Sequence, residues 1–401
     1  MVNLLSNARV VRVERTVEDV SWLMGRLTAV LDGTTRSVLV PVGGDEMPPA
    51  VVTDLEKRAA RDLDDVRLIV RTSGSTTGHG RLVGLSAAQL TASIGATDDR
   101  IGGPGTWVLA LPPHHIAGLQ VVARSVLAGT TPQVLTGSFD PESLAAGVDH
   151  ALSRDPHGRV HISLVPTQLV DALASPRCLE ALAQCTSVLV GGAAAGPELL
   201  SRARQAGIGV RVTYGMSETC GGCVYDGLPL EGVRVEIDQE HRVRLGGPMV
   251  MSGYLDADLG IGERDGTRWL TTSDLGHLDA GALVIDGRAD DVIVTGGLKV
   301  NASEVAQAVR DTGMVSRAAV LGLDDERWGQ LVTAVVVPSP SWTSAPQLRE
   351  AVASRLPRSH APRMVVTAED VPMLASGKVD RIGLRELAER ARDEGRAWSR
   401  D

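Results

Sequence analysis

Short apolar runs bounded by glycine or proline recur along the first two-thirds of the chain. Three of them are Trp107–Leu111, Val160–Val165 and Ser187–Val190. Short apolar runs flanked by glycine or proline are typical of buried β-strands. Between the runs, apolar residues recur at helical spacing, as in Leu119–Leu127 and Pro141–Leu152. This alternation predicts an α/β fold in which helices cover layered sheets.

The pattern changes near Arg288, where a second compact segment begins. We place the boundary at Asp290, which gives a large N-terminal domain (1–289) and a small α+β domain (290–401) joined by a hinge. The Gly- and Asp-rich stretch Leu255–Thr267 is interpreted as a surface loop. In the small domain the pattern predicts two helices and two strands, which are Ala302–Val309, Pro346–Leu356, Ala318–Leu323 and Val332–Val337.

Composition narrows the class of protein. The 401 residues are 43% hydrophobic and 22% charged, as in globular proteins that hold two or three domains. A net charge of −9 argues against a nucleic-acid binder but permits a local basic pocket. No export signal and no apolar run of membrane-spanning length is visible, and four cysteines are too few for a disulfide scaffold. We therefore expect a cytoplasmic protein without a membrane span; its oligomeric state, including a homodimer, stays open.

Lysine occurs only three times among the 40 basic residues. Because nearly all other basic residues are arginine, a lysine in this chain is a candidate for a role that requires lysine itself. Lys299 and Lys378 both fall in motifs described below, whereas chance survival on the surface is adequate for Lys57.

Four short motifs carry the candidate chemistry. The first, Arg71–Arg81, follows the apolar run Val66–Val70 and is rich in glycine and small hydroxyl residues. Such a loop can wrap polyphosphate oxygens with backbone N–H groups and hydroxyls, although a solvated loop of the same composition is equally consistent. It is not a Walker loop, because G-x-x-x-x-G-K-[ST] is absent.

The second motif, Thr213–Thr219, places a carboxylate beside hydroxyls, which suits Mg²⁺ and phosphate, or is a plain strand-to-loop turn. The third comprises Thr271–Gly276 and Asp286–Val300, in which a carboxylate and an arginine suit ribose hydroxyls and a Gly-Gly pair permits close backbone approach. The fourth, Ala375–Arg381, holds a lysine on a Ser-Gly turn, which has reach and charge; a solvated tail lysine is the alternative.

In this order and spacing, the four motifs resemble those of the adenylate-forming superfamily of acyl-CoA synthetases, peptide-synthetase adenylation domains and luciferase. The resemblance covers about residues 66 to 385 and is supported by Ala110–Leu119, Trp328–Gln330 and Leu356–Arg363. It implies that the chain uses ATP and Mg²⁺ to activate a carboxylic acid and passes the acyl group to coenzyme A.

The resemblance also implies roles for individual residues. The ATP phosphate loop should comprise Ser73, Gly74, Ser75, Thr76, Thr77 and Gly78. Adenine should lie against Tyr214, near Gly191, Gly192 and Ala193, and Gly215 is a further nucleotide-binding candidate. Ser217 should approach the phosphates, Glu218 should ligate Mg²⁺, and Asp274 with Arg288 should bind ribose.

Two further roles fall in the small domain. Lys378 should bridge the carboxylate and the α-phosphate during adenylation. Rotation about Asp290 should then bring Gly296, Gly297 and Lys299 to the adenylate for thioester formation.

The phosphate loop departs from the family pattern S-G-[ST]-T-G-x-P-K. It has an extra threonine, and His79-Gly80-Arg81 stands where x-Pro-Lys is expected. Arginine also binds phosphate, but with a planar fork instead of a point charge, so the role of Arg81 stays open.

The shortness of the chain, together with the stretches Ile101–Trp107 and Leu111–Ser125, is similar to actinobacterial 2-succinylbenzoate–CoA ligases of menaquinone biosynthesis. His115 is a candidate wall of the acyl pocket and is equally consistent with a structural histidine. The sequence does not identify a basic group for the second carboxylate of this substrate. Cys220-Gly-Gly-Cys223 is interpreted as two small pocket residues in preference to a zinc or redox pair, because no second pair has zinc-like spacing.

Three alternatives stay open. One is a ligase for another acyl or aryl acid, and another is an adenylation domain that loads a carrier protein, although no carrier sequence follows Asp401. The third is a degenerate nucleotide-binding protein, which the altered phosphate loop favours and the retention of Glu218, Asp274 and Lys378 disfavours.

Overall fold

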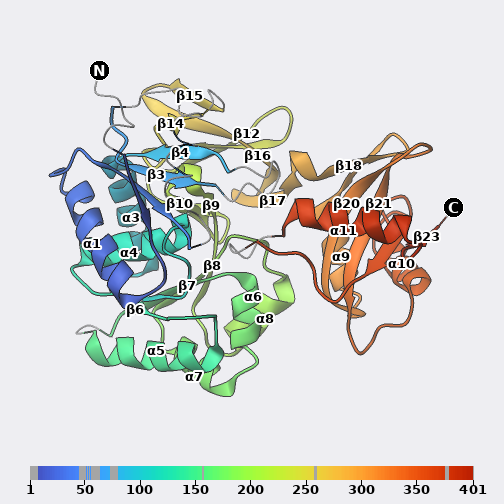
Figure 1. The fold of residues 1–401 in the computed structure, drawn as a ribbon, viewed down its shortest axis with the longest axis horizontal. Coiled ribbons are helices and arrows are strands. Elements are labelled where there is room, and N and C mark those ends of the chain that lie inside the picture. The colour runs from blue at the N-terminus through green and yellow to red at the C-terminus, as the bar shows by residue number, and fades with distance from the viewer. Residues whose placement is uncertain are drawn as a thin grey trace. The chain divides into compact units, whose positions relative to one another are not determined.

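The computed structural model describes residues 8–44, 51, 53, 55, 64–72, 80–155, 158–256, 260–374 and 379–400. The chain divides into two compact units (Figure 1). The large unit holds the described residues up to Thr72, Gly80–Glu236 and Arg244–Thr271; the small unit holds Ile237–Val243 and the chain from Thr272 onward. The division thus passes through a strand ahead of Asp290, and the boundary at Asp290 stays a prediction. Among the described helices, none is long and apolar enough to cross a membrane.

The main sheet of the large unit is mostly parallel. In the described residues its order is β11 (Leu228–Pro229), β10 (Gly221–Tyr225), β9 (Val210–Met216), β8 (Ser187–Val190), β7 (Val160–Leu164), β5 (Thr106–Leu109) and β6 (Gln133–Val134). Strands β5 to β9 pair in parallel, and β10 turns back antiparallel to β9. The predicted runs in this sheet are therefore strands, because apolar side chains are buried on both of its faces.

Helices cover both faces of this sheet (Figure 1). One face packs in a single apolar cluster with α5 (Pro141–Arg154), α6 (Pro166–Ala172), α7 (Pro176–Ala183) and α8 (Pro197–Gln205). The helices α1 (Val17–Leu31), α3 (Ala87–Ile101) and α4 (Ile116–Ala128) lie on the other side. There the Arg124 guanidinium of α4 stacks 5.0 Å from the ring centre of the fully buried Trp107.

A second sheet of the large unit positions the phosphate-loop motif. In the described residues its order is β1 (Ala8–Arg12), β2 (Val38–Val42), β3 (Leu68–Arg71), β4 (Leu82–Leu85) and β14 (Gly253–Tyr254). Strands β3 and β4 are antiparallel neighbours, with Arg71 opposite Leu82. The motif therefore joins the two strands of a hairpin whose apolar side chains are buried.

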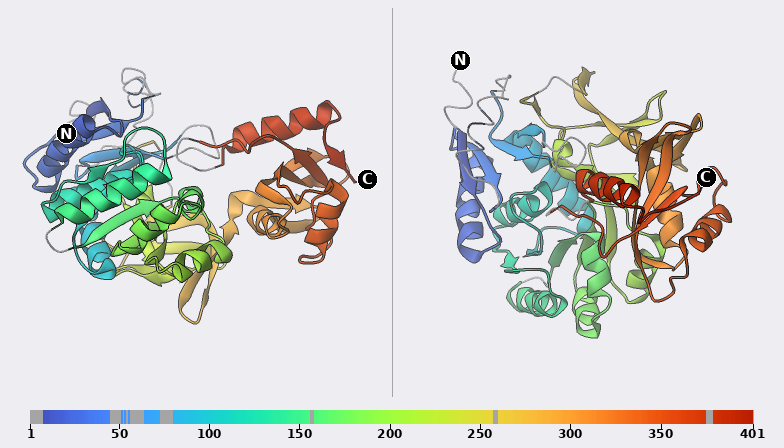
Figure 2. Two further views of the ribbon diagram at one scale, coloured as in Figure 1. Left: turned by 90° about the horizontal axis from the view of Figure 1, so that it is seen from below. Right: turned by 45° about the vertical axis from the view of Figure 1, so that its right-hand side comes forward.

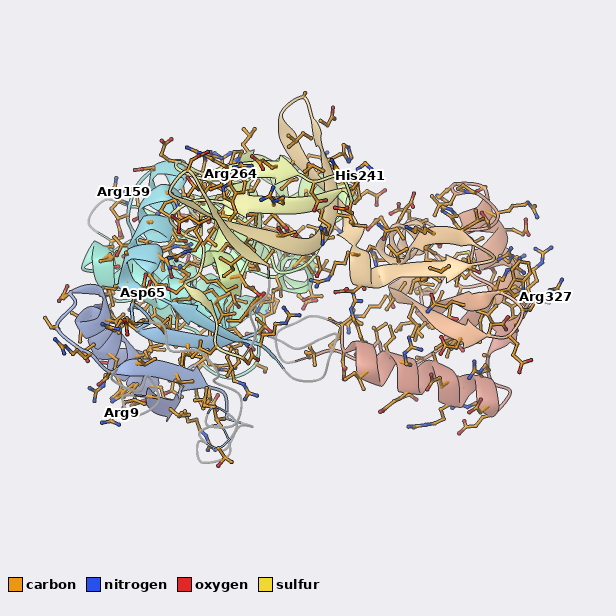
Figure 3. All side chains as sticks on the ribbon, turned by 90° about the horizontal axis from the view of Figure 1, so that it is seen from above. Arg9, Asp65, Arg159, His241, Arg264 and Arg327 are labelled. Atoms are coloured by element: carbon orange, nitrogen blue, oxygen red, sulfur yellow. The ribbon has the colours of Figure 1, made fainter. Side chains whose placement is uncertain are left out.

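The prediction of a surface loop over Leu255–Thr267 is wrong in part. Strand β15 (Ile261–Arg264) pairs with the start of β16 (Thr267–Asp279), with Arg264 opposite Thr267. Asp265 and Gly266 between them both have positive φ, 51° and 69°, as a tight hairpin turn requires. Arg264, labelled in Figure 3, stacks 4.6 Å from the ring centre of Trp269. The sequence of β15 is too charged to be recognised as a strand. Its hairpin turn and the contact between Arg264 and Trp269 stabilise it.

The small unit packs helices on both faces of its own sheet (Figure 2). In the described residues the sheet comprises β18 (Val292–Thr295), β19 (Leu298–Asn301), β20 (Val315–Asp325), β21 (Gly329–Pro338), β22 (Met364–Thr367) and β23 (Trp398–Ser399). One apolar cluster joins it to α9 (Ala302–Arg310) and α10 (Ala345–Ala353), and another joins it to α11 (Arg381–Asp393). Alternate residues of β21 enter the two clusters, so both sheet faces are buried. The predicted mixed architecture, with a larger and a smaller part, is confirmed.

Two short strands, β12 (Arg234–Ile237) and β13 (Arg242–Gly246), cross the division between the units. The other described elements are β17 (Ala282–Arg288) and the 3₁₀ turns η2 (Ser217–Thr219) and η3 (Ala289–Asp291). Within the small unit, β17 pairs antiparallel with the second half of β16.

Candidate active site

Three of the predicted segments meet at one edge of the main sheet. Because β5, β8 and β9 are parallel, their carboxyl ends lie at the same edge. His115 follows the end of β5, Gly191–Ala193 follow β8, and Tyr214 lies near the end of β9, with Ser217 directly after it. In open α/β sheets ligands bind outside the carboxyl ends of the strands, so this edge is the expected place for a nucleotide.

Two glycines at this edge are required by close backbone approach. A Cβ atom on Gly191 would lie 2.2 Å from Thr213 Oγ1. On Gly215 it would lie 2.0 Å from the Gly221 carbonyl oxygen of the adjacent β10. Any side chain at either position would therefore push β9 away from its neighbours.

Glu218 lies in the turn η2, directly after β9. Thr219 closes this turn, since its Oγ1 accepts from the Met216 N–H at 3.0 Å and donates to the Gly221 carbonyl at 2.8 Å. Gln120 of α4 and Ser93 of α3 both donate to the Cys220 carbonyl, at 2.6 and 3.2 Å. Buried side chains from two helices thus hold the backbone that carries Glu218.

The segment Met251–Tyr254 of the second sheet holds Glu218 from the other side. The Met251 N–H donates to the Glu218 carbonyl at 2.8 Å, and the Tyr254 hydroxyl donates to Glu218 Oε1 at 2.8 Å. Glu218 is only 9% exposed. Among the described residues no hydrogen bond reaches the other carboxylate oxygen, Oε2. One oxygen is therefore fixed and the other can serve a ligand.

The Tyr254 hydroxyl stays protonated in this setting. Burial raises the pKa of Tyr254, and the negative charge of Glu218 raises it further, while Arg81 acts in the opposite direction. The Arg81 guanidinium carbon lies 5.0 Å from the centre of the Tyr254 ring. A carboxylate, a phenol and a guanidinium are thus collected in the large unit.

The phosphate-loop motif is closed at its base by two hydrogen bonds between Thr72 and Arg81. The Thr72 N–H donates to the Arg81 carbonyl at 3.0 Å, and the Arg81 N–H donates to Thr72 Oγ1 at 2.8 Å. A Cβ on Gly80 would lie 1.8 Å from the Thr72 carbonyl oxygen, so only glycine fits there. The predicted phosphate-binding residues between these ends lie outside the described residues: Ser73, Gly74, Ser75, Thr76, Thr77 and Gly78.

His115 is the residue that precedes helix α4. Its backbone is extended, and its ring lies 4.3 Å from that of His114, which contacts the Val13 carbonyl at 3.3 Å. The structure thus places His115 at the same sheet edge as Tyr214, and its role in an acyl pocket stays a prediction.

Cys220 and Cys223 are buried free thiols. Burial raises the pKa of both, and each would have to lose a proton to act as a metal ligand or nucleophile. Among the described residues no group of three or more His, Cys, Asp or Glu could hold a metal ion. These findings favour small structural residues over a zinc or redox pair.

A single carboxylate suits Mg²⁺ that is bound together with a nucleotide. Mg²⁺ keeps several waters and takes only one or two protein carboxylates when phosphates supply its other ligands. Glu218, with one oxygen held by Tyr254 and a cation nearby for phosphate, fits this requirement.

The predicted ribose-binding pair lies in the small unit. Asp274 of β16 is opposite Arg288 of β17, and Arg288 Nη1 lies 3.5 Å from Asp274 Oδ1. The Asp274 N–H donates to Thr272 Oγ1 at 3.0 Å, and Asp274 is 8% exposed. Arg288 Nη2 also lies 3.4 Å from Asp290 Oδ2. Arg288 therefore has two carboxylate partners, and it can give up its contact with either of them to bind a ligand.

The Gly-Gly pair forms the turn between β18 and β19. Gly296 and Gly297 have φ of 56° and 79°, the left-handed values of a two-residue hairpin turn. Lys299 is exposed on β19, opposite Val294. Lys378 lies outside the described residues.

A cationic cluster beside this turn was not predicted from the sequence. The Trp328 carbonyl accepts from the Gly296 N–H at 2.8 Å, and the guanidinium carbons of Arg363 and Arg327 lie 3.6 and 5.2 Å from the Trp328 ring centre. Burial lowers the pKa of Arg363, and the positive charges of Arg400 and Arg327 lower it further. The motif that contains Trp328 can be recognised in the sequence. The sequence does not show that Arg327 and Arg363 lie on the same ring, because they are far apart in the chain.

Comparison with known proteins gives the family context. Residues 8–255 match the family described as AMP-binding enzyme, and residues 304–378 match the AMP-binding enzyme C-terminal domain. The chain is 42% identical over 383 residues to a probable 2-succinylbenzoate–CoA ligase of Mycobacterium tuberculosis, covering 90% of this chain and 95% of the relative. It is 30% identical to the 2-succinylbenzoate–CoA ligase of Bacillus velezensis, covering 96% and 82%.

A solved structure is similar over most of its length. It is the o-succinylbenzoate CoA synthetase of Bacillus subtilis in complex with its acyl-adenylate intermediate. The TM-score is 0.74 at 26% identity, and the match covers 94% of this chain and 87% of that one.

Replacing Gly215 tests whether close packing of β9 positions the Glu218 turn. We expect Gly215→Ala to destabilise the protein by about 2 kcal/mol or more, because its Cβ meets backbone atoms that cannot move aside cheaply. Thermal unfolding measures this effect. The matched control is Gly95→Ala in α3, where a Cβ meets no atom within 4 Å and better helix propensity should leave stability equal or higher. Equal melting temperatures for the two variants would contradict the prediction.

Proposed function

We propose that this chain, which belongs to the AMP-binding enzyme family, activates 2-succinylbenzoate with ATP and transfers the acyl group to coenzyme A. The observation that carries the proposal is the cluster of Glu218, Tyr254 and Arg81, which offers a metal-binding carboxylate oxygen beside a phosphate-binding cation. The choice of acid is supported by the relatives, which are named for this substrate and cover nearly the whole chain.

The reaction has two steps. In the first, a carboxylate oxygen of the acid attacks the α-phosphorus of ATP, the bond to the bridging oxygen breaks, and pyrophosphate leaves. In the second, the thiolate of coenzyme A attacks the acyl carbonyl, and the C–O bond to AMP breaks. Bound Mg²⁺ supplies charge compensation for the phosphates.

The protein contributes position and charge to the first step. Glu218 offers Oε2 to the metal, while Arg81 and the loop from Ser73 to Gly78 contact phosphate oxygens. Tyr214 and Gly191–Ala193 accommodate adenine at the sheet edge, and Ser217 reaches the phosphates. Such fixed donors lower the barrier because they need no reorganisation when charge develops.

The small unit contributes the remaining contacts. Asp274 and Arg288 bind the ribose hydroxyls, and Lys378 bridges the carboxylate and α-phosphate. The segment with Gly296, Gly297 and Lys299 serves thioester formation, and the adjacent cations Arg327 and Arg363 suit the phosphates of coenzyme A. We propose that residues 290–401 move as a domain about Asp290 between the two steps.

We further propose that the reaction takes place in the cytoplasm, where ATP and coenzyme A are both supplied. A homodimer remains a prediction. His115 is proposed as a wall of the acyl pocket, because it lies at the same sheet edge as the adenine contacts.

Pyrophosphate exchange tests the substrate and the first step together. With 2-succinylbenzoate and MgATP, labelled pyrophosphate should enter ATP without coenzyme A, because adenylation is reversible. Adding coenzyme A should then yield AMP and the acyl thioester. Benzoate, which lacks the succinyl side chain, is the matched control and should support no exchange. Formation of ADP, or exchange with benzoate alone, would refute the assignment.

Removing the carboxylate of Glu218 tests the metal role. Glu218→Ala should reduce adenylation by about 10²-fold or more and flatten its dependence on Mg²⁺, because a phosphate charge loses its fixed counter-ion. The rate of adenylate formation against Mg²⁺ concentration measures this effect, and circular dichroism checks the fold. Glu198→Ala, at an exposed glutamate of α8, is the control. Wild-type kinetics in Glu218→Ala would remove Glu218 from the site.

Two variants separate the half-reactions. Lys378→Ala should impair adenylation strongly while sparing thioester formation from supplied acyl-adenylate, because its proposed contacts belong to the first step only. Asp290→Pro fixes φ near −65° and should spare adenylation more than thioester formation. Rapid-quench assays of each half-reaction measure the split. Equal losses of both half-reactions in both variants would exclude domain alternation.

A further inference from the structure

One tyrosine side chain contacts both charged groups of the proposed phosphate site. Tyr254 is 6% exposed, its hydroxyl lies 2.8 Å from Glu218 Oε1, and its ring centre lies 5.0 Å from the Arg81 guanidinium carbon. The hydroxyl donates and the ring face attracts a cation, so one rigid side chain serves a carboxylate and a guanidinium at once.

The backbone fixes where this side chain lies. Strand β14 pairs antiparallel with β4, with Tyr254 opposite Val83, and the Leu255 N–H donates to the Leu82 carbonyl at 2.9 Å. Arg81 immediately precedes this paired stretch. The distance from the Tyr254 ring to Arg81 is therefore set by a strand register, which changes only in steps of whole residues.

The hydrogen bond to Glu218 also selects which carboxylate oxygen is free. A glutamate carboxylate, carried on three rotatable side-chain bonds, has several accessible orientations, which differ in the oxygen that they present to the metal. Engagement of Oε1 by a buried donor leaves Oε2 as the metal-binding atom. A hydrogen bond to a charged group contributes more than one between neutral groups, so its loss is measurable.

We propose that Tyr254 is a positioning residue for the first step, which orients Glu218 toward Mg²⁺ through its hydroxyl and Arg81 toward phosphate through its ring. The proposal rests on the proposed function, because it takes Glu218 as the metal ligand. It assigns separate parts of one side chain to separate measurable properties.

Removing only the hydroxyl tests the link to the metal. In Tyr254→Phe, the Mg²⁺ concentration that half-saturates binding of α,β-methylene-ATP should rise about tenfold, measured by titration calorimetry. This ATP analogue cannot be adenylated, so the readout is binding and not turnover. Binding of the analogue without Mg²⁺ should be unchanged, because the ring under Arg81 is kept.

The matched control is Tyr225→Phe. Tyr225 is also a buried tyrosine, and its hydroxyl lies 3.2 Å from Thr97 Oγ1 instead of a site carboxylate. This variant should show the wild-type Mg²⁺ titration even if its melting temperature falls. An equal rise in half-saturating Mg²⁺ in both variants would mean a general packing effect and would overturn the proposal.

Two further variants test the coupling to Glu218 and the part played by Arg81. In a Glu218→Gln background, Tyr254→Phe should cause no additional change in half-saturating Mg²⁺, because the hydroxyl acts through the carboxylate. Arg81→Met should weaken binding of the analogue without Mg²⁺ about tenfold and leave half-saturating Mg²⁺ unchanged. The Arg81→Met measurement leaves Tyr254 unchanged. It can therefore be made even if the Tyr254→Phe variant fails to fold.

The outcomes separate this proposal from the proposed function. Wild-type protein without Mg²⁺-dependent binding of the analogue would contradict the proposed function itself. Wild-type protein with such binding, and a Tyr254→Phe variant with the same half-saturating Mg²⁺, would contradict the positioning role alone.

Discussion

The hydrogen bonds from segment 251–254 to Glu218 join the main sheet of the large unit to its second sheet. Glu218 follows β9 of the main sheet, whereas Met251 and Tyr254 belong to the chain that enters the second sheet. The second sheet also carries the hairpin with the phosphate-loop motif. Because both backbone and side chain of Glu218 are held, and Tyr254 also lies against Arg81, the carboxylate keeps a fixed place relative to the strand that follows the motif. The site in the large unit depends on this junction.

Close backbone approach supports the junction from the main sheet. The absence of side chains at Gly191 and Gly215 lets β8, β9 and β10 pack near enough for the turn at Glu218 to be anchored on α3 and α4. The donors from Ser93 and Gln120 are buried and charge-neutral, so they fix the turn without altering the charge of the site. The polar groups of this region are thus divided between those that hold backbone and those that remain for ligand.

The small unit is built on a different principle. Its candidate residues lie on hairpins, with Asp274 and Arg288 across β16 and β17 and the Gly-Gly turn between β18 and β19. Pairing register places these side chains, and the β18–β19 hairpin also packs through Ile293 and Val300 into an apolar cluster of its sheet. In this unit backbone pairing therefore holds the candidate side chains, whereas buried side-chain hydrogen bonds hold Glu218 in the large unit.

The sequence alone was sufficient for the mixed α/β architecture with a larger and a smaller part. Buried strands such as β7 and β8 and helices such as α5 are determined by local apolar pattern and by their terminal Gly and Pro, so their positions could be predicted. The motif order likewise pointed to the reaction class, because each motif is local. The strand β15 was missed because a half-exposed hairpin strand has little apolar pattern to reveal it.

Only the tertiary structure decided which distant residues act together. Tyr254 is separated from Glu218 and Arg81 by many residues, and no periodicity relates them; strand register and the junction of two sheets bring them into contact. The same holds for Arg363 on Trp328 and for Gln120 on the Cys220 carbonyl. Contacts of this kind depend on packing between segments that are far apart in the chain, and the local pattern of residues does not predict such packing.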